Sequence, residues 1–247
     1  MWRPLELAAG ASEERGLGTL NLCVRRETDE AWVHASNDGV KPAGPEWTRW
    51  SIERESGLEV LPALPDRPVV VSPELPFYLP PQGIARVFVR VPLFARLDAV
   101  GPEGHRQSLG EFPTVVLSDT WWGGYTDGAL AYWVTTRARR NVTNEIFEPH
   151  LAICPLVLIN EFDQPLPVER FTVRVEYLTL FGRGDAAWTD EVQVRYRGVQ
   201  EGSEIRYTGR VPDVAGDLDL LAEHREKPPR GLHAKTFGRF RALSGWG

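Results

Sequence analysis

Residues 151–160 read L-A-I-C-P-L-V-L-I-N, an apolar run about as long as one β-strand. Apolar side chains occupy both alternating faces of this run, so we expect a strand that is covered by protein on both sides. Pro155 cannot donate a backbone hydrogen bond, which predicts a bulge at that residue. The run therefore indicates a buried sheet.

Period-two patterns extend this prediction over most of the chain. Valines alternate with arginines in residues 84–100, and residues 169–181 alternate over their whole length. The same periodicity places Trp50 and Ile52 on the opposite face from Trp47. The 23 glycines and 20 prolines indicate many turns. We therefore predict an all-β fold, built as a two-layer antiparallel β-sandwich.

The β pattern covers residues 1–212, which we predict to form one all-β body. A short likeness between residues 86–91 and 170–175 leaves open a division of this body into two similar lobes. The lobes would then be residues 17–117 and 118–212.

Residues 213–247 differ from the body. The spacing of Leu218, Leu220 and Leu221, followed by two prolines, predicts a short helix over residues 217–226. A basic, aromatic C-terminal arm follows, and its candidate partner contacts are Phe237, Arg239, Phe240 and Arg241. Such an arm suits an acidic partner or an anionic membrane surface; the alternative is a tail docked on the acidic body.

Composition excludes several classes of function. The net charge of −6 disfavours a nucleic-acid-binding protein, because such proteins neutralise phosphates with a basic face.

Cys23 and Cys154 lie far apart in apolar runs, which favours buried thiols over a disulfide or a metal site. No metal or phosphate-binding motif occurs, so we predict no cofactor. Without a signal peptide or a membrane span, we expect a soluble, cytoplasmic protein.

The densest aromatic stretch is residues 118–134, S-D-T-W-W-G-G-Y-T-D-G-A-L-A-Y-W-V. Exposed tryptophan and tyrosine rings beside a carboxylate are typical of sugar-binding and peptide-binding sites. The candidate binding residues are Asp119, Trp121, Trp122, Tyr125 and Asp127. The alternative is a structural turn in which Asp119 caps backbone amides and both indoles pack inward.

These observations favour a non-catalytic binding or assembly module that recognises a protein or a carbohydrate through this aromatic loop. A homo-oligomer is compatible with the sequence, and any membrane contact would be peripheral. One alternative is a carbohydrate-active hydrolase that uses paired carboxylates, Asp119 with Asp127 or Glu145 with Glu148. Another is a soluble accessory protein docked on a membrane protein through the basic tail.

Four collinear segments carry a family resemblance: R-P-V-V-V at 67–71, D-T-W-W-G-G at 119–124, I-C-P-L-V-L-I-N at 153–160 and T-D-E-V-Q-V at 189–194. In these segments the chain resembles a family known as domain of unknown function 432, seen largely in archaea. The resemblance implies one family domain over roughly residues 17–211. It implies no activity.

Overall fold

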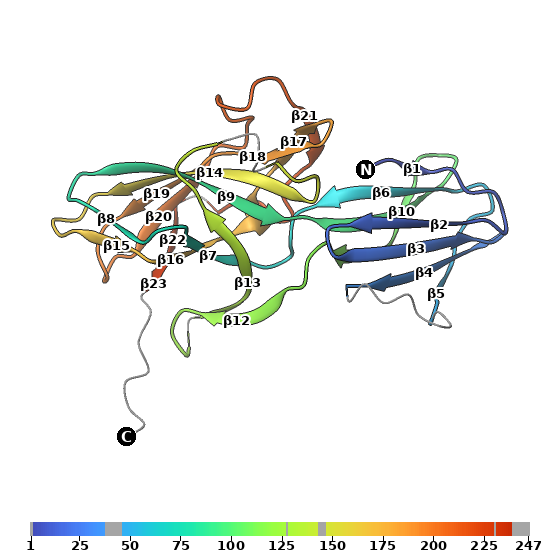
Figure 1. The fold of residues 1–247 in the computed structure, drawn as a ribbon, viewed down its shortest axis with the longest axis horizontal. Helices are drawn as coiled ribbons and strands as arrows, with labels where there is room; N and C mark the ends of the chain where they lie inside the picture. The colour runs from blue at the N-terminus through green and yellow to red at the C-terminus, as the bar shows by residue number, and fades with distance from the viewer. Residues whose placement is uncertain (1, 38–45, 127, 143–146, 230, 239–247) are drawn as a thin grey trace. The chain divides into compact units, whose positions relative to one another are not determined.

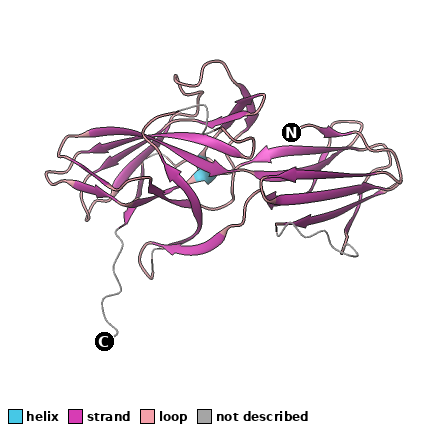
Figure 2. Ribbon diagram, in the orientation of Figure 1, coloured by secondary structure: helices cyan, strands magenta, loops and turns pink. Residues whose placement is uncertain are grey.

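The computed structural model describes residues 2–37, 46–126, 128–142, 147–229 and 231–238 (Figure 1). Within these ranges the regular elements are β-strands, apart from one 3-10 turn, η2 (Val175–Tyr177) (Figure 2). No described helix is long and apolar enough to cross a membrane. The prediction of an all-β fold is therefore confirmed.

The chain divides into two compact units, each discontinuous in sequence. The first unit consists of Met1–Ala63 and Pro92–Val116, and the second of Leu64–Val91 and Leu117–Gly247. The division left open by the sequence, into lobes 17–117 and 118–212, would put residues 64–91 in the first lobe. In the structure these residues belong to the second unit.

Two four-stranded antiparallel sheets make up the first unit. One has the order β1 (Pro4–Leu5), β6 (Gly57–Ala63), β10 (Phe94–Val100), β11 (Arg106–Pro113). The other has the order β2 (Ser12–Leu17), β3 (Leu20–Arg26), β4 (Glu30–Ser36), β5 (Thr48–Ser51).

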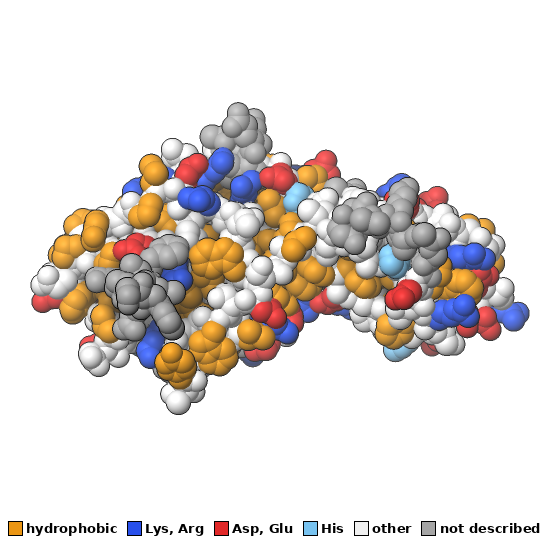
Figure 3. All heavy atoms as spheres, turned by 60° about the horizontal axis from the view of Figure 1, so that its bottom comes forward, with side chains coloured by type: hydrophobic (Ala, Val, Ile, Leu, Met, Phe, Trp, Pro, Cys, Tyr) orange, Lys and Arg blue, Asp and Glu red, His pale blue; other side chains and the backbone are white. Residues whose placement is uncertain are grey.

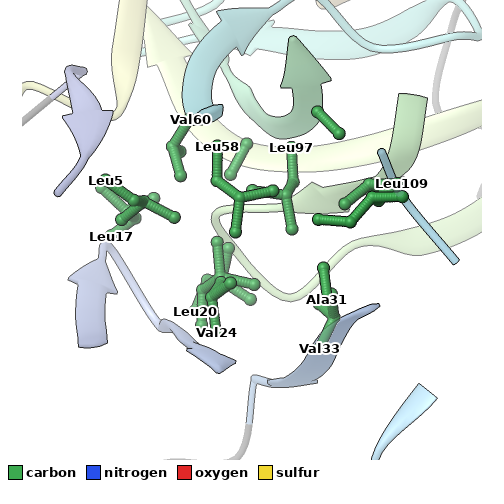
Figure 4. Close-up of a cluster of buried hydrophobic side chains, with 14 residues drawn as sticks. Leu5, Leu17, Leu20, Val24, Ala31, Val33, Leu58, Val60, Leu97 and Leu109 are labelled. Carbon is green, nitrogen blue, oxygen red and sulfur yellow. The ribbon is translucent and has the colours of Figure 1, made fainter. Parts of the chain in front are cut away.

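Both of these sheets contribute to one cluster of 14 buried apolar side chains (Figure 4). Burying each leucine of the cluster stabilises the unit by roughly 1.5–3 kcal/mol. Ile52 belongs to the cluster and Trp50 packs against it, whereas Trp47 packs near Trp32, with ring centroids 6.4 Å apart. The alternation predicted for these residues is therefore confirmed.

Three sheets account for the described strands of the second unit. The eight-stranded sheet has the order β21 (Asp219–Ala222), β17 (Leu180–Arg183), β18 (Ala186–Thr189), β14 (Leu151–Asn160), β19 (Val192–Tyr196), β20 (Ser203–Tyr207), β22 (Leu232–Ala234), with β9 (Ile84–Pro92) also paired to β14. The five-stranded sheet has the order β12 (Ser118–Trp122), β13 (Ala129–Ala138), β7 (Val69–Pro73), β16 (Arg170–Val173), β23 (Phe237–Gly238). In the third sheet, β15 (Leu166–Val168) pairs with β8 (Phe77–Leu79).

β14 is the strand predicted from the run at 151–160, and it is buried along most of its length. It pairs in parallel with β18 and then with β19, and the change of partner falls at Cys154 and Pro155. β13 also pairs in parallel with β7. The prediction of a wholly antiparallel fold is therefore wrong, and a two-layer sandwich is not confirmed. Strands that are apolar on both faces are typical of parallel pairing.

The predicted helix at 217–226 is wrong, because this segment contains the edge strand β21, paired antiparallel with β17. A segment of this length gains too little from local hydrogen bonds to hold a helix by itself. Gly182 in β17 favours the strand. A β-carbon on Gly182 would lie 2.8 Å from the Ala186 carbonyl oxygen and 2.6 Å from Leu221 Cδ1, so β21 and Leu221 lie close against this glycine.

The continuous strand predicted over 169–181 is interrupted. β16 ends at Val173, η2 follows, and β17 begins at Leu180 in a different sheet. Asp190 holds the chain after the break, because its Oδ1 accepts the backbone N–H of Thr179 at 2.9 Å. The interruption thus carries the chain from the five-stranded sheet to the eight-stranded one.

Candidate functional site

The aromatic stretch forms an antiparallel hairpin, β12 with β13, at the edge of the five-stranded sheet (Figure 1). Its register pairs Asp119 with Tyr132 and Trp121 with Leu130, so these four side chains share one face. Trp122 belongs to the opposite face, because successive residues of a strand alternate. The two neighbouring indoles therefore point in opposite directions.

The outer face of the hairpin is apolar and open to solvent. Trp121 is 53% exposed, Tyr125 is 99% exposed, and Leu130 is exposed as well. The Trp121 indole N–H donates to the Gly124 carbonyl at 2.9 Å, which holds the ring across the turn. A β-carbon on Gly128 would lie 2.3 Å from Trp121 Nε1, so the ring requires glycine there. Hydrophobic side chains reach the surface on the side of the molecule that Figure 3 brings forward.

A polar rim borders this apolar tip. Arg67 Nη1 donates to Asp119 Oδ1 at 3.1 Å, and the Arg67 guanidinium lies 5.3 Å from the centre of the Tyr132 ring. The Tyr132 hydroxyl donates to Asp66 Oδ1 at 2.8 Å. Burial and the hydrogen bond to Asp66 raise the pKa of Tyr132 to about 12, so the phenol stays neutral. These contacts join Asp66, Arg67, Asp119 and Tyr132 to one another along the rim.

Trp122 is half-buried and contacts the C-terminal segment. Its indole N–H donates to the Lys235 carbonyl at 2.7 Å, and the Arg170 guanidinium lies 5.6 Å from the ring centre. A β-carbon on Gly238 would lie 2.7 Å from Trp122 Cη2, so β23 passes directly against the indole. The structural interpretation of the stretch thus fits Trp122, whereas Trp121 stays open to a partner.

The hairpin places Asp119 and Trp121 of the predicted site on one face and Tyr125 in the exposed turn between its strands, while Asp127 lies outside the described residues. Arg67, Asp66 and Leu130 complete the surface and were not predicted. Arg67 and Asp66 precede β7, which lies beside β13 only through the parallel pairing of those strands. That pairing leaves no local signal in the sequence.

The predicted contacts of the arm are only partly described. Phe237 lies in β23, where its ring packs 6.4 Å from Phe171 and 5.6 Å from Tyr196 between ring centroids. Arg239, Phe240 and Arg241 lie outside the described residues. Phe237 is therefore half-buried within the second unit.

The carboxylates considered for hydrolysis are engaged in ion pairs. Asp119 pairs with Arg67, and Glu148 Oε1 accepts from Arg90 Nη1 at 2.8 Å. Burial lowers the pKa of His150, whose Nε2 lies 3.6 Å from Glu148 Oε2. The partner carboxylates Asp127 and Glu145 lie outside the described residues. No group of three or more His, Cys, Asp or Glu side chains able to hold a metal ion occurs in the described ranges.

The second unit contains a buried carboxyl group, that of Glu176, and a buried phenol oxygen, that of the half-buried Tyr207, which the sequence did not single out. Glu176 is 6% exposed, and its carboxylate lies 3.5 Å from Arg174 Nη1. Burial raises the pKa of Glu176 and also that of Tyr207, whose ring meets Tyr177 at 5.6 Å. Glu176 Oε2 and the Tyr207 hydroxyl have no hydrogen-bond partner among the described residues. Buried polar groups of this kind cluster at functional sites more often than elsewhere.

A family model described as "Protein of unknown function (DUF432)" matches residues 1–241. No curated protein and no solved structure matches the chain.

Proposed function

The chain belongs to this family of proteins of unknown function, as its four sequence segments predicted, and we propose that it acts as a non-catalytic binding module. The recognition surface is the outer face of the β12–β13 hairpin. The observation that carries the proposal is the exposure of Trp121, Tyr125 and Leu130 together at a sheet edge.

Exposed aromatic side chains of this kind are the usual anchors of protein interfaces. Tyrosine, tryptophan and arginine are enriched in the residues that contribute most to binding. Each aromatic side chain buries roughly 150–250 Å² when a partner covers it. Trp121 and Tyr125 supply two such anchors, and Arg67 borders them with a charge that is already hydrogen-bonded.

The polar contacts of the surface favour a protein partner over a carbohydrate. Sugar recognition depends on a few polar groups that hydrogen-bond the hydroxyls of the ligand. On this surface the Trp121 N–H is bonded to Gly124, Asp119 to Arg67, and Tyr132 to Asp66. What the face offers is therefore mainly apolar and aromatic area, which suits an apolar patch on another protein.

Site-specific photocrosslinking tests this proposal. With a photoreactive phenylalanine at position 125, irradiation in a lysate of the native host should give a discrete crosslinked protein, because Tyr125 projects fully into solvent. The same residue at position 75 is the matched control, since Leu75 is 79% exposed in the same unit but lies near Ala138, at the end of β13 opposite the turn that carries Tyr125.

The purified crosslinked protein should then bind the unmodified chain, and Trp121→Ala should weaken that affinity about tenfold or more. Leu75→Ala should leave the affinity unchanged. Equal crosslinking from both positions, or unchanged affinity in Trp121→Ala, would contradict the proposal. Binding to oligosaccharides that Trp121→Ala abolishes would instead assign the surface to carbohydrate.

For the first unit we also propose the two-layer sandwich predicted from the sequence. Its support is the single apolar cluster to which both four-stranded sheets contribute. An experimental structure of the chain tests it, and the absence of two facing layers in that unit would rule it out.

A further inference from the structure

A cavity of about 410 Å³ lies in the second unit, where the C-terminal segment passes from one sheet to another. β22 pairs with β20 in the eight-stranded sheet, whereas β23 pairs with β16 in the five-stranded sheet. Lys235 and Thr236 form the link between β22 and β23, and both line the cavity. The opening therefore sits at the seam between two sheets.

The walls of the cavity are mainly apolar. Tyr196 and Phe237 meet edge to face, with ring centroids 5.6 Å apart, and Leu166, Pro167 and Val199 complete the apolar lining. Pockets for small molecules typically have volumes of about 300–1,000 Å³ and such a lining. An engineered apolar cavity of about 150 Å³ binds benzene, so this one has room for a ligand of two rings.

The turn between β19 and β20 shapes one side of the cavity. The Gly202 N–H donates to the Gly198 carbonyl at 2.8 Å, which closes the turn. Gly198 has φ +106°, and a β-carbon there would lie 3.0 Å from the Phe162 ring. Only glycine fits this position without strain, so the shape of the turn beside the opening depends on Gly198.

Ser203 lines the same cavity and is 1% exposed. Its Oγ has no hydrogen-bond partner among the described residues. A buried hydroxyl without a partner lowers stability, so a ligand that supplies a polar atom gains from meeting it. The unpartnered hydroxyl is thus a second observation, independent of the cavity's size, that indicates a ligand.

Lys235 carries the only formal charge among the described residues that line the cavity. It is exposed, so a group next to its ammonium keeps contact with water. A carboxylate can therefore approach Lys235 without the high cost of full desolvation. The charge of the lining favours an anion over a neutral or cationic ligand.

From these observations we propose that the cavity binds a small amphipathic organic acid. Its apolar body lies against Tyr196 and Phe237, a hydroxyl or carbonyl oxygen meets Ser203 Oγ, and its carboxylate faces Lys235. This site shares no lining residue with the outer face of the β12–β13 hairpin, so it goes beyond the proposed recognition surface.

Isothermal titration calorimetry with the full chain tests the proposal. The probes are 6-hydroxy-2-naphthoate, the corresponding carboxamide and the corresponding aminomethyl compound. The carboxylate should bind at least fivefold more tightly than the carboxamide, and the amine more weakly than both. Lys235→Met should remove this order. Absence of binding by all three probes, or equal affinity for them, would overturn the proposal.

Two further variants locate the bound probe. Val199→Trp should block the cavity and abolish binding, whereas Val214→Trp, at another exposed valine of the same unit, should bind as the unmodified chain does. Ser203→Ala should weaken 6-hydroxy-2-naphthoate about three- to tenfold but leave 2-naphthoate unchanged. Unchanged affinity in Val199→Trp, or an equal loss in both tryptophan variants, would overturn this location. Matching circular dichroism spectra of the tryptophan variants serve as the folding control.

Discussion

The two units hold their buried acidic side chains in different ways. Beside the apolar cluster of the first unit, Asp98 accepts a hydrogen bond from Arg96 at 2.8 Å and lies 3.6 Å from Arg106. In the second unit, Glu176 lies 3.5 Å from Arg174, and burial still raises its pKa. Polar atoms without a hydrogen-bond partner among the described residues are buried in both units, at Asp98 Oδ2 in the first and at Glu176 Oε2 in the second. The buried carboxylate of the first unit is therefore paired more closely with arginine than that of the second.

The largest effect is expected for Leu97→Ala in the first unit. Leu97 is fully buried in the apolar cluster, so truncation should lower the free energy of unfolding by about 2–5 kcal/mol, measured by urea denaturation. The exposed Leu75 gives the matched substitution, expected to cost less than about 0.5 kcal/mol. Similar losses for the two variants would break the comparison, because the cluster would then not support the fold.

Trp122→Ala should have the next largest effect, at about 2 kcal/mol. The substitution removes the hydrogen bond to the Lys235 carbonyl and the packing against Gly238. Trp121→Ala, one residue away on the outer face, should change stability by less than about 1 kcal/mol. Thermal unfolding of both variants checks this difference. Equal destabilisation would mean that the outer indole is structural as well.

Glu176→Gln should change how stability depends on pH. Burial and the neighbouring Glu226 raise the pKa of Glu176 above its usual 4.5, against the opposing effect of Arg174. The folded state therefore binds more protons than the unfolded state, and this contribution to stability is lost as pH rises from about 4.5 through the folded pKa. Glu176→Gln should lack that loss and gain stability relative to the unmodified chain across this window.

Glu161→Gln is the control, because the pKa of Glu161 is shifted in the opposite direction to that of Glu176. Hydrogen bonds from Arg195 and Arg197 lower the pKa of Glu161, so its contribution to stability is present above pH 4.5 and lost as pH falls. Urea unfolding of the three proteins between pH 4 and 8 separates the two cases. Parallel curves for Glu176→Gln and the unmodified chain would show that folding does not raise the pKa of Glu176.

The smallest effect concerns the two thiols, one in each unit. Cys154 is fully buried in β14, and burial raises its pKa to about 12, whereas Cys23 is half-buried in β3. A thiol reagent at pH 8 should therefore modify Cys23 in the folded protein and Cys154 only after unfolding. Peptide mass spectrometry identifies the site. Modification of Cys154 in the folded protein would contradict its placement in the interior.

Local patterns were enough to predict some of the buried strands. β14 and β9 follow from apolar runs and alternation, and the opposite faces of Trp47 and Trp50 follow from the same periodicity. Local patterns do not indicate which strands pair with one another. The parallel pairing of β14, for example, depends on segments that are distant in the sequence. For the same reason, the spacing of Leu218, Leu220 and Leu221 predicted a helix, whereas pairing with β17 makes this segment a strand.

The candidate site, too, could be predicted from the sequence only in part. The residues of the hairpin were predicted, but their division into an outer and an inner indole was not. Strand periodicity through Trp121 and Trp122 was the available signal, because adjacent residues of a strand face opposite ways. The cavity had no such signal, since Leu166, Tyr196 and Lys235 come together only through tertiary folding.

The hydrogen bond from Trp122 to the Lys235 carbonyl joins the back of the hairpin to the segment that lines the cavity. If a ligand in the cavity displaces this segment, the Trp122 indole moves with it. The fluorescence of Trp122 then reports whether the cavity is occupied. Thermodynamic linkage then makes the effect mutual: whatever factor the small acid imposes on affinity at the hairpin, the hairpin's partner must impose on affinity for the acid.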